Sequence, residues 1–190
     1  MGLSGMRLFL AVRLASELQK AIGAFIAQNA AKTKGVKWID VGQAHFTLFF
    51  LGEQPAELVA EIDPLLQKTA TEQRNFQLSL GPGGVFPSWK APRVLWLGVE
   101  KGREELKALA AGVTAACVER GVPRPERAFT PHLTLGRVKK PPAVIDREAL
   151  VRGVEGEMEV AAFTLFASEL RPQGPLYREL ATYPLGQVKN

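Results

Sequence analysis

The sequence predicts an α+β fold of two pseudo-symmetric lobes, each a mainly antiparallel sheet covered by two helices, with a central cleft between them. Three observations predict it. The order strand–helix–strand–helix–strand occurs twice along the 190 residues, and matching residues in the two copies are 87 positions apart. A Pro- and Gly-rich segment separates the copies. We therefore expect one bilobal domain over residues 1–190, with repeat units 6–81 and 93–185 joined by a crossover at 82–92.

The first strand and first helix of each copy follow from apolar patterns. Met6–Val12 and Arg93–Val99 are short runs of apolar and aromatic residues, which is typical of buried strands. Apolar residues then recur at helical spacing over 14–25 in the first copy and over 106–117 in the second. Cys117 belongs to this apolar pattern, so we expect it to be a small core residue rather than a nucleophile.

The second strand of each copy contains the same tetrad pattern, His-x-Thr-Leu, at His45–Leu48 and His132–Leu135. A helix is expected after each tetrad. The first helix begins at Pro55, and Pro64 must kink or split it because proline lacks the amide hydrogen. The second helix is shorter, around Asp146–Arg152.

The remaining strands close the two copies. Phe76–Leu80 and Met158–Phe166 are the expected third strands, and Leu176–Leu185 adds a further apolar strand. Mixed helices and strands with short connections favour a small antiparallel sheet in each half, so each copy is expected to form its own lobe.

The composition excludes several chemistries. A single cysteine rules out an internal disulfide framework and points to a reducing compartment. Two histidines are too few for a multi-histidine metal centre, so we expect no metal and no cofactor. No early apolar run is long enough for a signal peptide, and none approaches the ~20 residues of a membrane span. We expect a soluble, monomeric, cytoplasmic protein with no membrane partner.

Charge is distributed unevenly along the chain. The 24 Lys and Arg against 19 Asp and Glu give a net charge of +5. Residues 53–72 carry five acids and one base, so they hold −4 and the rest of the chain holds +9. A basic surface of this size suits a polyanion such as RNA, through phosphate neutralisation. A solvated, slightly basic surface explains the same numbers, so charge alone does not identify a partner.

The repeated tetrad is the strongest functional signal. Side chains i and i+2 of a strand share a face, so His45 points with Thr47, and His132 points with Thr134. A pseudo-two-fold axis between the lobes would bring both pairs to one cleft. Two imidazoles can then serve as acid and base at one phosphorus, while the hydroxyls donate to its oxygens. A single His-x-Thr is usually a satisfied surface or core pair, but here two copies use every histidine in the chain.

Three further residues are candidates for substrate binding. Arg137 follows the second tetrad and can clamp phosphate oxygens in bidentate fashion. Strict alternation puts it opposite His132, so this role needs the strand to end or bulge near Gly136; otherwise it is a surface arginine. Trp89 and Lys90 lie in the crossover and can stack a base and hold a phosphate.

Four segments carry a resemblance that spans most of the chain. They are His45–Glu53 (HFTLFFLGE), Arg93–Val99 (RVLWLGV), Phe129–Arg137 (FTPHLTLGR) and Ser168–Tyr177 (SELRPQGPLY). In these segments, and in their order and spacing, the chain resembles the bacterial and archaeal RNA 2′,3′-cyclic phosphodiesterases, known in older usage as 2′-5′ RNA ligases, of the two-histidine phosphoesterase superfamily.

The resemblance implies a bilobal fold with a central cleft and metal-independent hydrolysis of terminal 2′,3′-cyclic phosphates of RNA, tRNA-like fragments included, to 2′-phosphates. It implies that His45 donates a proton to the departing 3′ oxygen and that His132 is the base that activates water. Thr47 and Thr134 would hold the phosphate oxygens, and Arg137 matches an arginine that the family has after its second tetrad.

Two positions depart from the family pattern, and two other functions stay open. Gly136 stands where alanine is common, and Phe49 stands at a position, often bulky or basic, that we expect in the substrate-side lining. One alternative is the reverse reaction, which joins a 2′,3′-cyclic end to a 5′-hydroxyl in a 2′-5′ linkage. The other is a non-catalytic module that binds RNA ends.

Overall fold

The computed structural model describes residues 5–172 and 174–186. The predicted domain over 1–190 therefore reaches beyond the described residues at both ends. In chain order the elements are β1 (Met6–Arg13), α1 (Ser16–Ala30), β2 (Val36–Trp38), the 3-10 turn η1 (Val41–Gln43), β3 (His45–Gln54), α2 (Glu57–Glu72), β4 (Phe76–Phe86), β5 (Val94–Val99), α3 (Arg103–Glu119), β6 (His132–Val138), α4 (Arg147–Arg152), β7 (Glu157–Val160), β8 (Ala162–Arg171) and β9 (Gly174–Pro184).

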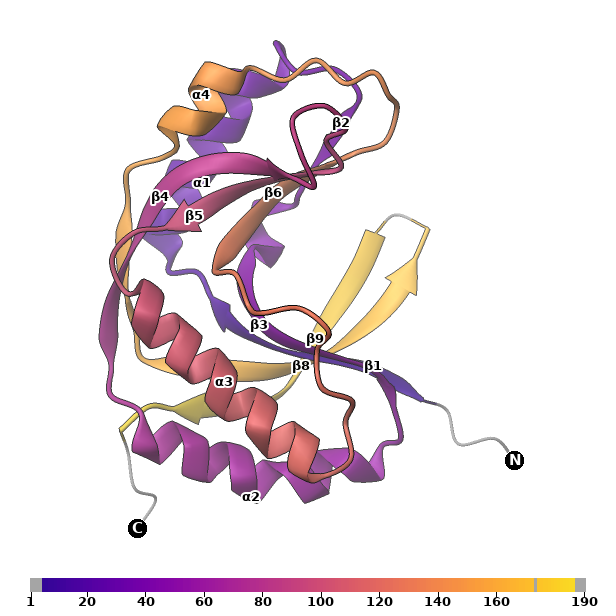
Figure 1. Ribbon diagram of the computed structural model, residues 1–190, viewed down its shortest axis with the longest axis vertical. Coiled ribbons are helices and arrows are strands. Elements are labelled where there is room, and N and C mark those ends of the chain that lie inside the picture. Colours follow the sequence, from indigo (N-terminus) through magenta and orange to yellow (C-terminus); the bar gives the residue numbers. More distant parts are fainter. Residues whose placement is uncertain (1–4, 173, 187–190) are drawn as a thin grey trace.

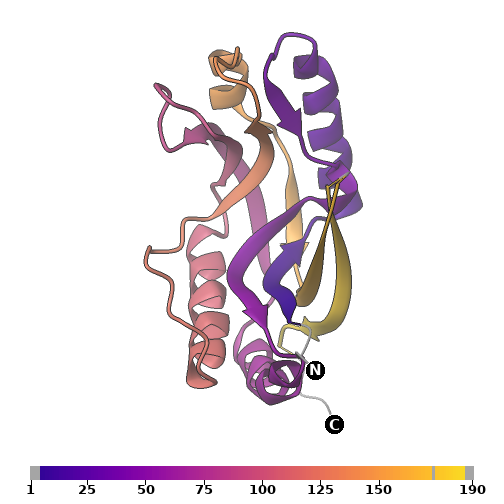
Figure 2. The same ribbon diagram turned by 90° about the vertical axis from the view of Figure 1, so that its right-hand side faces the viewer.

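The strands form two antiparallel sheets, which lie in the lower and upper halves of Figure 1. Sheet I has the order β3-β1-β8-β9, and sheet II has the order β2-β6-β5-β4-β7. Helices α2 and α3 pack together over sheet I, whereas α1 and α4 lie at the opposite end of the molecule over sheet II (Figures 1 and 2). The predicted α+β fold, with two antiparallel sheets and two helices on each, is confirmed.

The strand orders reveal both the pseudo-symmetry and an exchange of elements. The run β3-β1-β8 of sheet I corresponds to β6-β5-β4 of sheet II. However, β4 from the first repeat unit pairs with β5 of the second, and β8 from the second pairs with β1 of the first. Helices cross over too, since α3 follows β5 of sheet II but packs against β3 of sheet I. The expectation that each copy forms its own lobe is therefore wrong.

Several boundaries differ from those expected. Residues 82–86 extend β4, so the connection between the halves is shorter than the predicted crossover 82–92. The strand expected at Met158–Phe166 is two strands, β7 and β8. Pro64 does not split α2, because its position is exposed and water can bond to the carbonyl that lacks a helical partner. The short strand β2 was not predicted.

The two tetrads keep the spacing of 87 residues, but the neighbouring strands do not. Ala11 lies opposite Thr47 in sheet I, and Trp96 lies opposite Thr134 in sheet II. The first strands of the two halves are therefore related by 85 residues, two fewer than the sequence repeat predicts. Because two residues are one full period of a strand, this slip leaves every side chain on its expected face.

Candidate active site

The two tetrads lie on β3 of sheet I and β6 of sheet II, two strands that contact each other. Phe46 and the matching Leu133 are fully buried in the core between the sheets and their helices. The histidine and threonine of each tetrad are half-buried and lie on the opposite face of the strand. The alternation predicted from the sequence is confirmed in both strands.

Each histidine is held by the same backbone hydrogen bond. His45 Nδ1 lies 2.7 Å from the carbonyl oxygen of Gln43, and His132 Nδ1 lies 2.7 Å from that of Thr130. A carbonyl oxygen only accepts, so Nδ1 carries the hydrogen in both rings and Nε2 is left for another partner. The two halves thus present two imidazoles in equivalent orientations, each with Nε2 available for proton transfer.

A β-bulge follows the second tetrad and brings Arg137 to its face. The pairing of β6 with β5 shifts register after Thr134, so that Leu135 and Gly136 are both buried. A bulge adds one residue to a strand and reverses the alternation beyond it. The exposed Arg137 therefore shares the face of His132, and the bulge that this role requires is present.

The matching bulge in β3 puts Phe50, not Phe49, beside the first tetrad. Phe49 is 6% exposed and packs in the core, whereas Phe50 is 48% exposed. The expectation that Phe49 lines the substrate side is wrong, because the bulge turns it inward. Phe50 holds the position that corresponds to Arg137, and the guanidinium of Arg7 lies 5.2 Å from the centre of its ring. One half offers an aromatic ring where the other offers a cation.

Aromatic side chains enclose His45. The ring centroids of Phe9, Tyr177 and Phe166 lie 5.0, 5.3 and 6.4 Å from that of the imidazole. Burial among these rings lowers the pKa of His45 below its ordinary 6.5, and the hydrogen bond to the Gln43 carbonyl opposes this by a smaller amount. The neutral imidazole is therefore favoured at this position in the free protein.

His132 has more open surroundings. Its ring contacts Phe86 edge-to-face, with 5.1 Å between centroids, and Phe86 in turn stacks on Trp96 at 5.0 Å. The two histidines share a tether and an orientation but differ in enclosure, so the two halves of the site are not chemically identical.

Tyr177 connects the two sheets electrostatically. It lies on β9 of sheet I, yet the charges of Arg137 from sheet II and Arg7 from sheet I both act on its hydroxyl. Burial is the larger effect and raises the pKa of Tyr177, while the two arginines oppose it. A pocket of about 190 Å³ adjoins Tyr177 and His45. The charge of Arg137 therefore affects a tyrosine whose ring contacts His45.

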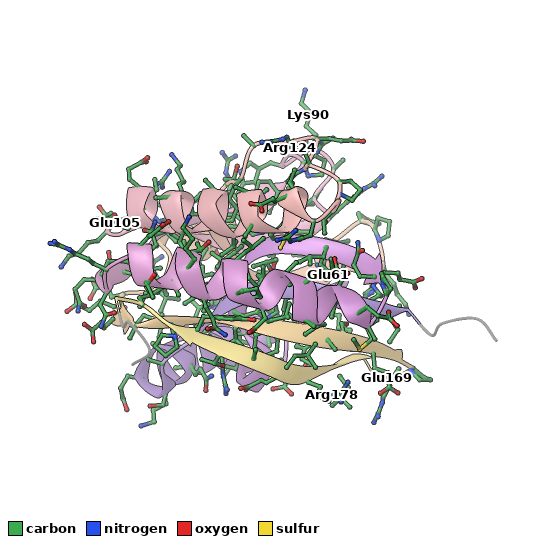
Figure 3. The ribbon with its side chains drawn as sticks, turned by 90° about the horizontal axis from the view of Figure 1, so that it is seen from below. Glu61, Lys90, Glu105, Arg124, Glu169 and Arg178 are labelled. Carbon is green, nitrogen blue, oxygen red and sulfur yellow. The ribbon has the colours of Figure 1, made fainter. Side chains whose placement is uncertain are left out.

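Trp89 and Lys90 lie in the loop between β4 and β5. The Trp89 ring packs on the core, and the guanidinium of Arg147 lies 4.9 Å from its centre. Lys90 is exposed and projects outward at the edge of the molecule, on the same side as Arg124 in Figure 3. Their predicted roles in stacking a base and holding a phosphate stay predictions.

One basic residue at the site was not singled out from the sequence. β2 pairs with β6 so that Lys37 lies directly opposite Arg137, and cross-strand partners share a face. A strand of three residues is too short to show an alternating pattern, so neither β2 nor its register gave a signal.

The described residues show neither a metal centre nor a membrane span. Within 5–172 and 174–186, no three His, Cys, Asp or Glu side chains are grouped so as to hold a metal ion. No helix in the same ranges is long and apolar enough to cross a membrane.

Fold and site together define a class of α+β protein in which pseudo-symmetric strands each present one histidine and one threonine. The family model of the 2′-5′ RNA ligase superfamily matches residues 15–170. An RNA 2′,3′-cyclic phosphodiesterase of Archaeoglobus fulgidus is 37% identical over 183 residues, which cover 94% of this chain and 99% of that protein. One of Methanothermobacter thermautotrophicus is 34% identical over 186 residues, covering 94% and 98%. The chain belongs to the 2′-5′ RNA ligase superfamily.

Solved structures agree with this assignment. A crystal structure of a Thermus thermophilus protein superposes with a TM-score of 0.81 at 32% identity, covering 95% of this chain and 98% of that one. Escherichia coli LigT complexed with 3′-AMP superposes with a TM-score of 0.80 at 28% identity, covering 96% and 99%.

Proposed function

We propose that the protein is a 2′,3′-cyclic phosphodiesterase that opens terminal cyclic phosphates of RNA to 2′-phosphates. The observation that carries the proposal is the pair of imidazoles, each tethered through Nδ1 and each presenting Nε2. Hydrolysis of a cyclic phosphodiester requires that water lose a proton and the leaving oxygen gain one, which takes one base and one acid. The names of the curated relatives support this substrate.

Under this proposal the protons move between the two tetrads. His132 Nε2 takes a proton from water as the water oxygen attacks phosphorus. The bond from phosphorus to the 3′ oxygen breaks, and that oxygen takes the proton from His45 Nε2. The product carries a 2′-phosphate and a 3′-hydroxyl, His45 is left neutral and His132 is left protonated. Exchange with solvent restores both, and no step needs a metal.

The enclosure of His45 sets a condition on its role as the acid. Burial favours its neutral form in the free protein, whereas a proton donor must be charged. A phosphodiester anion next to Nε2 favours the imidazolium, because a nearby opposite charge raises the pKa of a histidine. We therefore propose that His45 takes up its proton together with the substrate.

Thr47, Thr134 and Arg137 stabilise the phosphate in this proposal. The threonines share the faces of the two histidines, so their hydroxyls can donate to the non-bridging oxygens as negative charge accumulates there. Arg137 joins them through its bulge and supplies positive charge and bidentate hydrogen bonds. In this proposal Trp89 and Lys90 contact parts of the RNA that lie farther from the cyclic phosphate.

The same arrangement supports 2′-5′ joining as a second candidate, although this reaction is not the reversal of hydrolysis. A 5′-hydroxyl takes the place of water: His132 Nε2 takes its proton as its oxygen attacks phosphorus, the bond to the 3′ oxygen breaks, and His45 Nε2 gives that oxygen a proton. Both tetrads come from one chain, so we propose a monomer as the active form. A cytoplasmic location stays a prediction.

The test is incubation of the chain with a nucleoside 2′,3′-cyclic phosphate in EDTA, followed by chromatography that separates the 2′- and 3′-phosphates. We expect the 2′-phosphate and a bell-shaped dependence of the rate on pH. His45→Asn and His132→Asn are each expected to lower kcat by about 10²- to 10⁴-fold. The double variant should lower kcat little further than either single variant does, because the two histidines act as a unit.

Threonine variants provide a matched control. Thr47→Val and Thr134→Val are expected to lower the rate, whereas Thr71→Val, at an exposed position on α2, is expected to leave it unchanged. A substantial rate in His132→Asn, or activity that appears only with added metal, would overturn the mechanism. Tight binding of RNA ends with no turnover would show that the protein is a non-catalytic module that binds RNA ends and not an enzyme. A tRNA half-molecule pair tests for joining.

A further inference from the structure

A cavity of about 320 Å³ lies between α1 and α4, the two helices at the upper left of Figure 1. This volume is at the lower end of the ~300–1,000 Å³ that is typical of small-molecule sites. α1 and α4 make few direct contacts with each other, so the cavity separates them. None of the residues assigned to the candidate active site lines it. It is therefore a second place at which the protein can hold a small ligand.

Backbone contacts fix both ends of α4 against the rest of the protein. Lys34, after α1, and Val144, before α4, exchange two backbone hydrogen bonds of 2.9 and 3.0 Å. After α4, Gly153 has a φ of 76°, and a Cβ there would lie 2.9 Å from the carbonyl oxygen of Gly81 in β4. Only glycine fits this position without strain. The walls of the cavity are therefore set by the fold itself.

Asn29 interrupts the apolar face of α1 at the wall of the cavity. The buried residues of this helix are Leu18, Ile22 and Asn29, which lie on one face. Only 8% of Asn29 is exposed. A polar side chain at such a position needs hydrogen-bond partners, because a buried polar group without one costs free energy.

The protein satisfies only one end of the Asn29 side chain. Nδ2 donates to the carbonyl oxygen of Phe25 at 2.8 Å, whereas Oδ1 has no partner among the described residues. Within the same residues, Trp96 Nε1 is the one side-chain nitrogen or oxygen that is both sealed from solvent and unpartnered. Asn29 Oδ1 is therefore accessible, and because Asn29 lines the cavity, it is reached from there. The cavity thus offers a ligand a hydrogen-bond acceptor.

Two cations and one carboxylate also line the cavity. Lys32 follows α1 and Arg152 ends α4, and neither forms an ion pair with another described residue. Asp146 Oδ1 accepts from the amide of Ala149 at 2.9 Å and so caps α4, while its second oxygen has no partner among the described residues. The three charges sum to +1, so the cavity attracts an anion, and Arg152 can hold a phosphate through two parallel hydrogen bonds.

These groups define the chemistry of a fitting ligand. It carries an anionic group for Lys32 and Arg152, a hydrogen-bond donor for Asn29 Oδ1, and a flat apolar surface for the half-buried ring of Phe25. A hydroxyl group can donate to the second oxygen of Asp146. A nucleoside monophosphate combines a phosphate, a base with N–H donors and a sugar with hydroxyls in one small molecule.

We propose that the cavity between α1 and α4 is a second ligand site, which binds a nucleoside monophosphate without reacting with it. The phosphate lies between Lys32 and Arg152, the base packs on Phe25 and donates to Asn29 Oδ1, and the sugar donates to Asp146. This inference goes beyond the proposed function and does not depend on it.

The test is an NMR titration of isotopically labelled protein with adenosine 5′-monophosphate. The signals to follow are the backbone amides of Ala149 and Gly153 and the side-chain amide of Asn29, which report on the cavity even if the nucleotide also binds near the two histidines. Ribose 5-phosphate and inorganic phosphate are titrated in parallel. We expect saturable shifts, and about tenfold tighter binding of the nucleotide than of the other two, because only the nucleotide has a base to stack on Phe25.

Two variants and a matched control locate the site. Lys32→Gln/Arg152→Gln should weaken nucleotide binding at least about tenfold, because both residues pair with a charged group. The control, Arg74→Gln/Lys101→Gln, removes one arginine and one lysine that are exposed elsewhere, and should bind like the parent. Asn29→Leu should weaken binding about three- to tenfold. Its free energy of unfolding should equal or exceed that of the parent, because leucine continues the apolar face of α1.

Three results would overturn the proposal. The first is that the nucleotide shifts none of the cavity signals, or that Lys32→Gln/Arg152→Gln binds it with the affinity of the parent. The second is equal affinity for inorganic phosphate, which would assign the cavity to free phosphate. The third is an Asn29→Leu variant that loses stability but keeps its affinity, which would make Asn29 a structural residue. Hydrolysis of a nucleoside cyclic phosphate enters none of these readouts, so the two proposals stand or fall separately.

Discussion

The Tyr177→Ala substitution is expected to raise the pKa of His45 and to destabilise the protein at neutral pH. The Tyr177 ring lies edge-to-face on the imidazole, with 5.3 Å between centroids, and packs on Phe9 at 5.0 Å. Removing it admits water to the imidazole and relieves the desolvation that lowers the pKa of His45.

The loss of stability follows from the apolar area returned to water. An aromatic side chain buries about 150–250 Å² when enclosed, and Tyr177 is half-buried, so truncation to alanine exposes about 100 Å². At ~25 cal/mol per Å² the free energy of unfolding falls by about 2.5 kcal/mol at about pH 7.

The pH dependence has a defined sign. The unfolded chain binds the His45 proton near pH 6.5, and the folded protein binds it only at lower pH. The stability linked to this group is therefore fully present above pH 6.5 and is lost as the pH falls through the folded pKa. In Tyr177→Ala the pKa of His45 in the folded protein moves up towards 6.5, so the variant loses less stability than the parent when the pH falls. The difference in free energy of unfolding between parent and variant therefore shrinks as the solution is acidified.

Two measurements test this reasoning. The chain has two histidines, so an NMR titration shows two imidazole signals, and His132→Asn assigns them by removal. Urea unfolding at about pH 7.5 and at about pH 5.5 gives the difference in free energy of unfolding between parent and variant at each pH. Leu176→Ala, a truncation of the exposed neighbour, is the matched control. A His45 midpoint that stays constant or falls in Tyr177→Ala contradicts the argument.

Two further predictions concern buried groups outside the site. Tyr183→Phe removes the hydrogen bond that the buried phenol donates to Asp63 Oδ1 at 2.9 Å, and should lower the free energy of unfolding by about 1.5 kcal/mol. This loss should vanish in an Asp63→Ala background, and persistence there would show that packing is responsible. Burial raises the pKa of Cys117 to about 12, so the folded protein should not react with a thiol reagent at about pH 8 while the urea-unfolded chain reacts fully. Rapid reaction of the folded chain would refute it.

The site was more predictable from the sequence than the topology was. Strand alternation needs only a period of two, so the facing of His45 with Thr47 and of His132 with Thr134 could be inferred from the tetrads alone. Gly136 beside Arg137 hinted at the second bulge, because Arg137 needed one to reach the site. Nothing in the apolar run of β3 marked the first bulge, so Phe49 was assigned to the face that Phe50 occupies.

The exchange of strands left no local signal. An apolar run such as that of β4 predicts a buried strand. Which strand it pairs with depends on where both of its faces can be covered by other elements, and this is a property of the whole fold. The register of β2 and therefore the place of Lys37 depend in the same way on β6. The periodicity of a sequence indicates which side chains share a face of a strand, whereas the pairing of strands depends on packing in three dimensions.

The exchanged strands make the two halves of the chain dependent on each other. Sheet I without β8 would expose the edge of β1, and sheet II without β4 would expose the edge of β5. A polypeptide of half this length can build the same pair of sheets only as a dimer that swaps its third strands and its first helices, the counterparts of α1 and α3. The single chain is the covalent form of such a dimer: a cut in the loop between β4 and β5 leaves two fragments that need each other to fold. Covalent linkage also lets the two copies diverge, so that one half can keep Phe50 where the other has Arg137.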